Sequence, residues 1–169
     1  MPYPSQATSS FTLDHVAYRA YYGALSYDSH EQCGVKGGEE MRDLVFAMEL
    51  RGSAAPVAGR EGVLRARTAG RGPTGETVTF ESEVVLSGET FTETGRITYG
   101  TRGSVQFETV GVGYLGPSPL PDTQWGVIAW RVTAGDGEFQ GARGYITSNF
   151  TVGANGEVVD NHSVRLVLP

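Results

Sequence analysis

The feature that most constrains this chain is a period-two alternation of apolar and polar side chains, which begins near Met41 and is punctuated by glycine at intervals of roughly 8–12 residues. Such alternation is typical of half-buried β-strands, and its regular interruption is typical of a sandwich or barrel. Asn155-Gly156 can supply the two positive φ angles of a type I′ hairpin turn, and Ser87-Gly88 separates two other alternating runs. We therefore expect an antiparallel meander from Met41 onward.

Eight strands are expected, with boundaries accurate to about 2–4 residues. They span 43–53, 60–69, 76–86, 90–99, 103–113, 124–133, 143–152 and 157–168. An open meander of this size has two exposed edges, and closure removes them. The predicted fold class is therefore all-β, a single closed eight-stranded antiparallel barrel over residues 42–169. Period-two parity places large apolar side chains inside it: Leu44, Phe46, Met48, Phe80, Val84, Phe91, Ile97, Phe107, Trp130, Phe150, Val164 and Leu166.

Residues 1–41 have a different pattern and are predicted to be an N-terminal segment that caps one mouth of the barrel. Apolar residues recur there at helical spacing, at Leu13, Val16, Ala17, Ala20 and Ala24. Three tyrosines favour a strand instead: Tyr18, Tyr21 and Tyr22. A short helix and a strand both remain open for this segment.

Length and charge exclude several classes of protein. A chain of 169 residues fits one domain, since domains cluster at roughly 100–150 residues. Its net charge of −6 opposes nucleic-acid binding. The chain has no apolar run of the ~18 residues that a membrane span needs, and its first ten residues lack the regions of a signal peptide, so a cytoplasmic location is expected. The single Cys33 can form neither an internal disulfide nor a cysteine-rich zinc site.

Two stretches resemble a known superfamily. VIAWRVTAGDGEFQGARGYITSNF carries the G-x-G-x-F-x-G-A-x-G strand-turn-strand signature of the allene oxide cyclase-like and dirigent-like barrels, at Gly135, Gly137, Phe139, Gly141, Ala142 and Gly144. FTETGRITYGTRGSVQF resembles the middle strands of the same superfamily. The resemblance implies an eight-stranded antiparallel barrel, often trimeric, with an apolar lumen open at one end. It also implies an isomerase, a cyclase or a stereochemical guide for lipophilic small molecules, without metal or organic cofactor.

The chain departs from the plant cyclases in its first barrel strand. That strand carries an inward Glu-x-Asn pair in the plant enzymes, whereas here Leu44, Phe46, Met48 and Leu50 form the apolar face and Glu49 has the opposite parity. The plant active-site carboxylate is therefore not carried over.

Because all the basic residues except Lys36 are arginine, we expect a bacterial member of the superfamily from a GC-rich genome.

Three ionisable residues share the parity of apolar neighbours and are the candidate catalytic residues. Glu93 is in phase with Phe91 and Ile97, while Asp160 and His162 are in phase with Val164. A desolvated glutamate has a raised pKa, so a pocket with these groups offers both a proton donor and an acceptor. The alternative is that Asp160 and His162 face solvent near the Asn155-Gly156 turn, and that Tyr99 or a cross-strand donor merely satisfies Glu93.

Aromatic and other large apolar side chains of inward parity are the candidate substrate-binding wall. They are Phe46, Met48, Phe80, Phe91, Tyr99, Phe107, Trp130 and Phe150. Ordinary core packing is the alternative explanation for each. Ser82 and Ser148 share the inward parity and, being small, leave space for a ligand.

Other chemistries have weaker support. Cys33 has His30 nearby in the sequence but no third orienting group, as a cysteine nucleophile requires. His15, His30 and His162 lack the spacing of a metal motif, so we expect no metal site. In GDGEFQG a strand follows the glycines, whereas a phosphate-binding loop needs a helix there.

The hypothesis that follows is a cofactor-independent cyclase or isomerase that folds a lipophilic small molecule in the barrel lumen, in bacterial natural-product biosynthesis. Two alternatives stay open: a binding protein that leaves its ligand unchanged, and a dirigent-like guide for a reaction initiated elsewhere. A homo-oligomer, dimer or trimer, is also expected, because Val85 and the segment VGVGYLG leave lightly charged outer walls.

Overall fold

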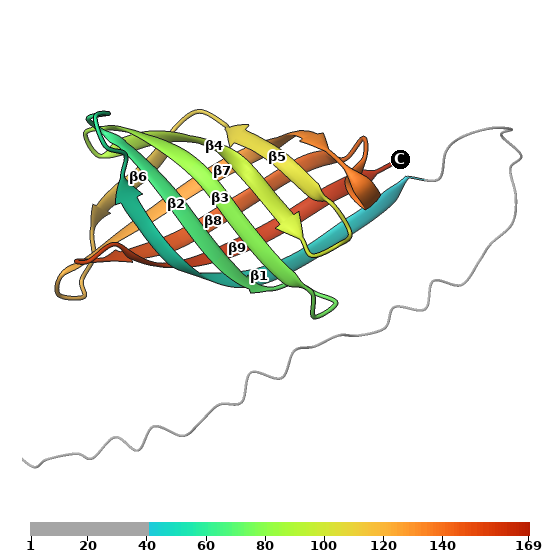
Figure 1. Cartoon of the computed structure of the whole chain (residues 1–169), viewed down its shortest axis with the longest axis horizontal. Coiled ribbons are helices and arrows are strands. Elements are labelled where there is room, and N and C mark those ends of the chain that lie inside the picture. The colour runs from blue at the N-terminus through green and yellow to red at the C-terminus, as the bar shows by residue number, and fades with distance from the viewer. Residues whose placement is uncertain (1–40) are drawn as a thin grey trace, which may run out of the picture. The chain divides into compact units, whose positions relative to one another are not determined.

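The computed structural model describes residues 41–169, which form one β-sheet that closes on itself (Figure 1). The elements are β1 (Arg42–Pro56), β2 (Val63–Arg71), β3 (Thr77–Ser87), β4 (Thr90–Tyr99), β5 (Ser104–Thr109), β6 (Gly113–Pro117), β7 (Thr123–Gly135), the short 3-10 helix η1 (Gly137–Phe139), β8 (Arg143–Gly153) and β9 (Glu157–Leu168). The predicted N-terminal cap, with His15, His30 and Cys33, lies outside the described residues.

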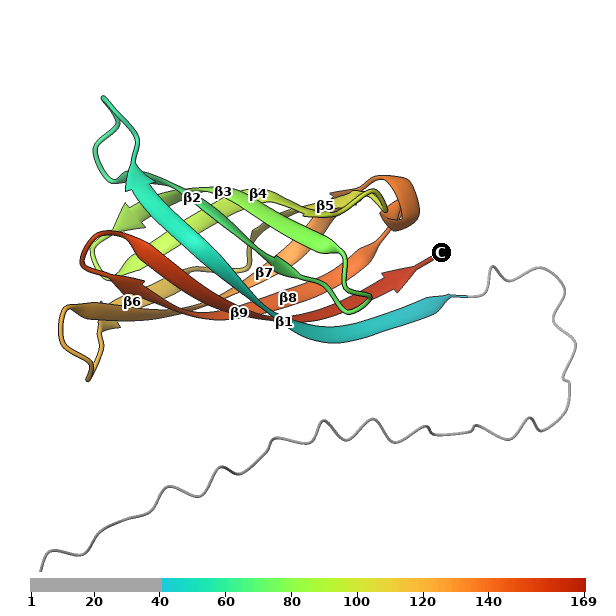
Figure 2. The same cartoon turned by 60° about the horizontal axis from the view of Figure 1, so that its bottom comes forward.

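The sheet closes because β1, the first strand of the described residues, pairs with β9, the last. Around the barrel the order is β1, β2, β3, β4, β5, β7, β8 and β9, and β9 pairs with β1. Every pairing is antiparallel, and Figure 2 shows the same closed wall from a second direction. The remaining strand, β6, follows β5 along the chain and pairs with β4 on one side and β7 on the other. The predicted all-β, eight-stranded antiparallel barrel is confirmed.

The strand predicted over 103–113 is interrupted, which is a correction to the sequence-based boundaries. It ends as β5 at Thr109, and the chain resumes as β6 at Gly113. Gly111 has a φ of 71°, a left-handed conformation that breaks the ladder, and Val110 and Val112 on either side are exposed. The wall therefore has a break between β5 and β6 that the period-two pattern does not reveal.

Side chains of the predicted interior fill the barrel. Of the twelve predicted core residues, nine are buried, and Leu44, Phe46 and Phe150 are half-buried. At mid-height, Phe80 stacks on Phe107 with ring centroids 5.3 Å apart, and Phe107 packs on Trp130 at 4.8 Å. This aromatic cluster separates the two ends of the barrel.

One end of the barrel is plugged by the glycine-rich signature. The signature forms the end of β7, η1 and the start of β8, where Phe139 is buried against Tyr99 with ring centroids 4.7 Å apart. Gly137 has a φ of 59°, and a Cβ there would lie 2.4 Å from the backbone oxygen of Arg102. The signature thus acts structurally, by sealing what we call the plugged end. The opposite end, with the β1–β2, β3–β4, β6–β7 and β8–β9 turns, is called the open end.

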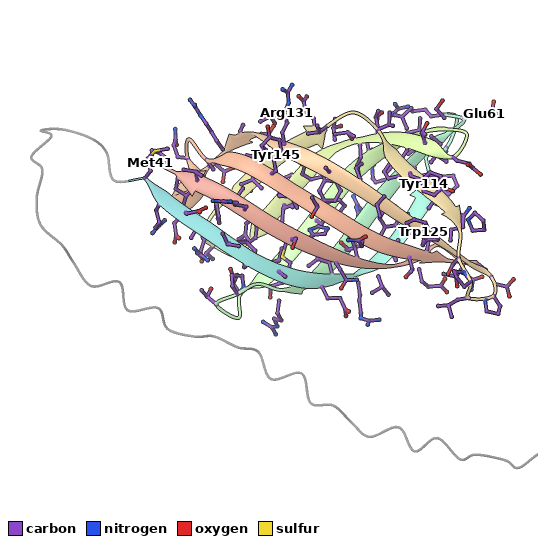
Figure 3. All side chains as sticks on the ribbon, turned by 180° about the vertical axis from the view of Figure 1, so that it is seen from behind. Met41, Glu61, Tyr114, Trp125, Arg131 and Tyr145 are labelled. Atoms are coloured by element: carbon purple, nitrogen blue, oxygen red, sulfur yellow. The ribbon has the colours of Figure 1, made fainter. Side chains whose placement is uncertain are left out.

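A row of small residues crosses part of the outer wall. Across β7, β8, β9 and β1, one register row consists of small uncharged residues, Ala129, Thr147, Ser163 and Ala47. Tyr145, which is 61% exposed, projects from this face together with Arg131 (Figure 3). Exposed ion pairs lie on both sides of the barrel, such as Arg67–Glu81 between β2 and β3 and Arg165–Asp43 between β9 and β1. Within residues 41–169 no helix is long and apolar enough to span a membrane.

Candidate functional site

A cavity of about 140 Å³ lies inside the barrel at the open end. Its walls are mostly apolar and come from eight strands, with Thr68, Glu93, Gln124 and Asp160 as the polar lining residues. An engineered apolar cavity of about 150 Å³ is known to take up benzene. The space is therefore sufficient for one ring, and it opens toward the half-buried residues Leu64, Leu86 and Phe150 at the open end.

Glu93 places a carboxyl group in this apolar cavity. It is 6% exposed and projects inward from β4, as its parity predicts. The Ser82 hydroxyl donates to Glu93 Oε1 at 2.5 Å from the neighbouring strand β3. Burial is the main cause that raises the pKa of Glu93 to about 8; the Ser82 hydrogen bond acts in the opposite direction, and the negative charge of Asp160 adds to the effect of burial. Glu93 is therefore mostly protonated at neutral pH and can donate a proton or a hydrogen bond.

At the break between β5 and β6, the Thr109 side chain holds the backbone of Glu93 in place. The β4 ladder pairs with β5 as far as Thr94 and with β6 from Phe91, so Glu93 faces the interruption. There the Thr109 hydroxyl replaces a backbone partner: it accepts from the Glu93 N–H at 2.6 Å and donates to the Glu93 carbonyl at 2.8 Å. One side chain thus satisfies both backbone groups of the candidate acid.

Asp160 and His162 form a second buried polar pair, on β9. Asp160 Oδ1 accepts from the Ser148 hydroxyl at 2.5 Å, and Asp160 Oδ2 is 2.8 Å from His162 Nε2. Because a carboxylate accepts, Nε2 carries the hydrogen. The two residues are 5% and 2% exposed, so the alternative that they face solvent is wrong. Asp160 reaches the cavity, whereas His162 lies behind it, edge-on to the Phe80 and Trp130 rings.

Two polar groups of the cavity wall are without a hydrogen bond among the described residues: Thr68 Oγ1 and Trp130 Nε1. The indole N–H of Trp130 is near enough to lower the pKa of Glu93, but it does not meet hydrogen-bond geometry with that carboxyl. Buried polar groups are nearly always paired, so both lack a partner that such groups normally have. The ring nitrogen Nδ1 of His162 is also unpaired within residues 41–169.

The predicted substrate-binding residues separate into two sets. Phe80, Phe91, Trp130 and Phe150 line the cavity. Phe46, Met48, Tyr99 and Phe107 lie elsewhere in the interior. Phe46 and Tyr99 pack edge to face near the plugged end, and Phe107 packs behind Phe80 and Trp130. Parity identifies the face of a strand but not the height along the barrel, which is why all eight residues looked equivalent in the sequence.

Three residues that position the site were not recognised from the sequence. The sequence pattern predicts only that Ser82 and Ser148 leave room for a ligand, whereas in the structure each donates a hydrogen bond to one of the buried carboxyl groups. Their shared inward parity with Glu93 and Asp160 was the available signal. Thr109 had no comparable signal, because its role depends on the interruption after β5. Among the described residues, no group of three or more His, Cys, Asp or Glu side chains could hold a metal ion.

Comparison with known proteins gives a likeness in structure. No family model matches the chain, and no curated protein sequence matches it. The solved structure of the pterocarpan synthase dirigent protein GePTS1 superposes with a TM-score of 0.58 over 83% of this chain and 98% of that one. The chain has a dirigent-like barrel fold. Sequence identity between the two is 16%, so the likeness concerns the fold alone.

Proposed function

We propose that this dirigent-like barrel takes up a small, largely apolar molecule through its open end and guides that molecule's reaction by holding it in one conformation. The observation that carries the proposal is the apolar cavity of about 140 Å³ whose wall includes Glu93 and Asp160. The structural likeness to a dirigent protein supports the same function. Apolar walls select a lipophilic molecule, and two carboxyl groups on different strands select how it is oriented.

Holding a reactant in one conformation is itself a sufficient mechanism. Well-oriented reactions gain up to about 7–11 kcal/mol from fixed geometry, so few polar groups are required. Here the aromatic walls restrict the ring, while a protonated Glu93 donates a hydrogen bond to an oxygen of the guest. A guest of about one ring that carries a hydroxyl or carbonyl group fits both conditions.

A second candidate is the cofactor-independent cyclase or isomerase, in natural-product biosynthesis. The observation that favours it is the pair formed by Glu93, whose pKa is about 8, and Asp160 in the same cavity. A neutral acid near a hydrogen-bond-accepting carboxylate is suited to donating one proton and receiving another. In this function Glu93 is the catalytic acid, Asp160 the base, and His162 a positioning residue that holds Asp160.

Uptake into the cavity can be measured through Trp130, which lines it. The other tryptophan, Trp125, is partly exposed and is removed in a Trp125→Phe background. Titration with p-cresol, and with toluene for comparison, is expected to change Trp130 emission saturably, with p-cresol binding more tightly. Ala66→Leu fills the cavity from β2 and is the matched control. An identical response in the Ala66→Leu protein, or no saturable response, would contradict the proposal.

The three functions differ in what they do to a prochiral guest that binds. A guide leaves the rate of a separately initiated reaction unchanged and alters the enantiomeric ratio of its product. An enzyme converts the guest unaided, and Glu93→Gln lowers that rate about 10²- to 10⁴-fold, the usual contribution of a general acid. A binding protein changes neither rate nor enantiomeric ratio. Measuring both quantities for the same guest therefore distinguishes the three.

A further inference from the structure

A cleft of about 300 Å³ lies at the plugged end, separate from the open-end cavity and lined by different residues. It arises from strand stagger. β1 pairs with β9 from Arg42, but it pairs with β2 only from Leu50, so residues 42–49 have a strand neighbour on one side within the described chain. The cleft lies between this part of β1, the β2–β3 turn and η1, and Phe46, Tyr99 and Phe139 contribute apolar walls.

The Tyr99 side chain lines this cleft and carries an unused hydrogen-bond donor. Tyr99 is 1% exposed and lines the cleft, and its hydroxyl has no hydrogen-bond partner in the part of the chain that the structure describes. Burial and the nearby Glu76 raise the pKa of this hydroxyl above its usual value, so it stays protonated. Buried polar groups without partners are rare in folded proteins, and such a group calls for an acceptor from beyond the described residues 41–169.

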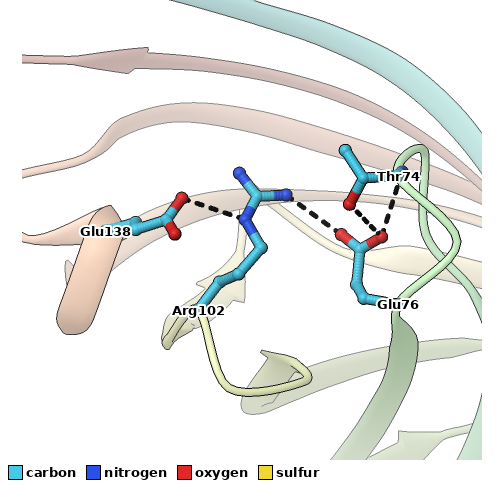
Figure 4. A network of polar contacts seen from close by, with 4 residues as sticks. All are labelled: Thr74, Glu76, Arg102 and Glu138. Carbon is cyan, nitrogen blue, oxygen red and sulfur yellow. Dashed lines mark hydrogen bonds and ion pairs between the residues drawn. The ribbon is translucent and has the colours of Figure 1, made fainter.

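The charges around the cleft indicate what that acceptor is. Arg102 donates from Nε to Glu138 at 2.9 Å and from a terminal nitrogen to Glu76 at 3.1 Å (Figure 4). Glu76 is in turn held by the backbone and hydroxyl of Thr74, at 3.0 and 2.7 Å. Two carboxylates thus neutralise the single guanidinium, which opposes binding of an anion. The ion pairs also join the β2–β3 turn to η1, so the cleft is pre-formed.

We propose that this cleft is a second binding site, for a neutral molecule of one or two rings whose carbonyl oxygen accepts the hydrogen bond of the Tyr99 hydroxyl. The rings pack on Phe46 and Phe139, and the cation–π contact of Arg102 with Phe139, 5.6 Å from guanidinium to ring centroid, keeps that wall in place. This site does not depend on the function proposed for the open end.

The test uses the full chain carrying Ala66→Leu, in which the open-end cavity is filled. Two probes are titrated by ¹⁹F NMR: 4-fluoroacetophenone, which has the carbonyl, and 4-fluoroethylbenzene, which lacks it. Tyr99→Phe removes the hydroxyl and keeps the ring, and Tyr145→Phe removes a hydroxyl from the exposed outer wall as the matched control. Leu44→Trp, which fills the cleft from β1, provides a second variant.

We expect saturable binding of 4-fluoroacetophenone that weakens about 2- to 10-fold in Tyr99→Phe, the value of one neutral hydrogen bond. The affinity of 4-fluoroethylbenzene should be the same in both proteins, Tyr145→Phe should have no effect, and Leu44→Trp should abolish binding of both probes. The proposal is overturned if the ketone does not bind saturably, if Tyr99→Phe affects both probes equally or neither, or if the Leu44→Trp protein binds as before.

Discussion

Replacing Glu93 with glutamine should remove a pH dependence of stability that arises from one buried carboxyl group. Glutamine has nearly the same size and can still accept from Ser82, but it does not titrate. In the folded protein the pKa of Glu93 is about 8, whereas its ordinary value is 4.5. Between these values the native state keeps a proton that the unfolded chain has released.

The sign and size of the effect follow from proton linkage. Where the native state binds more protons, the free energy of unfolding falls as pH rises, by about 1.4 kcal/mol per pH unit. The stability that protonated Glu93 contributes is therefore fully present below pH 4.5 and is lost progressively up to about pH 8. The loss between these two pH values amounts to roughly 5 kcal/mol. Glu93→Gln should be close to wild type near pH 4.5 and more stable than wild type at pH 8, by up to that amount.

Urea denaturation followed by tryptophan fluorescence at pH 5, 6, 7 and 8 measures the free energy of unfolding of each protein. The difference between variant and wild type should grow with pH. Glu61→Gln, an exposed carboxyl on the β1–β2 turn (Figure 3), is the matched control and should follow wild type throughout. A difference between Glu93→Gln and wild type that stays constant from pH 5 to 8 would refute the assignment of a buried, neutral Glu93.

Three further predictions concern the frame of the barrel. Thr109→Val removes the hydroxyl that bonds both backbone groups of Glu93 and should lower the free energy of unfolding by about 1–3 kcal/mol in urea denaturation, whereas Thr109→Ser should cost less than about 1 kcal/mol. Gly137→Ala and Gly59→Ala both place alanine at positive φ, but only the Cβ at 137 meets backbone, at 2.4 Å, while residue 59 has open space. Thermal denaturation should therefore show the larger loss at 137, and equal losses would contradict the sealing role of the signature. Light scattering should give a mass above the 18.0 kDa of one chain, because the row of small uncharged residues across β7, β8, β9 and β1 and the exposed Tyr145 beside it favour subunit packing, and Tyr145→Asp should shift the protein toward the monomer. A monomeric wild type at micromolar concentration would contradict that prediction.

The strand pattern of this barrel could be predicted from the sequence because burial on one face requires alternation along every strand. A slip of one residue turns a strand inside out, so the inward positions of Phe80, Glu93 and Asp160 were determined locally. The closure of the meander followed from the number of strands and the cost of open edges. The glycine-rich signature likewise indicated a dirigent-like barrel before any contact was known.

Tertiary structure alone decided which inward residues share a cavity. The position of each residue along the barrel axis depends on how the staggered strands close into a barrel. Phe91 and Trp130 therefore line the open-end cavity, whereas Tyr99, on the same face of β4 as Phe91, lies at the plugged end. The partners of the buried carboxyls also depend on register across strands, which brings Ser82 to Glu93 and Ser148 to Asp160. Alternation is a property of one strand, whereas height and pairing are properties of the closed sheet, and only the closed sheet assembles the site.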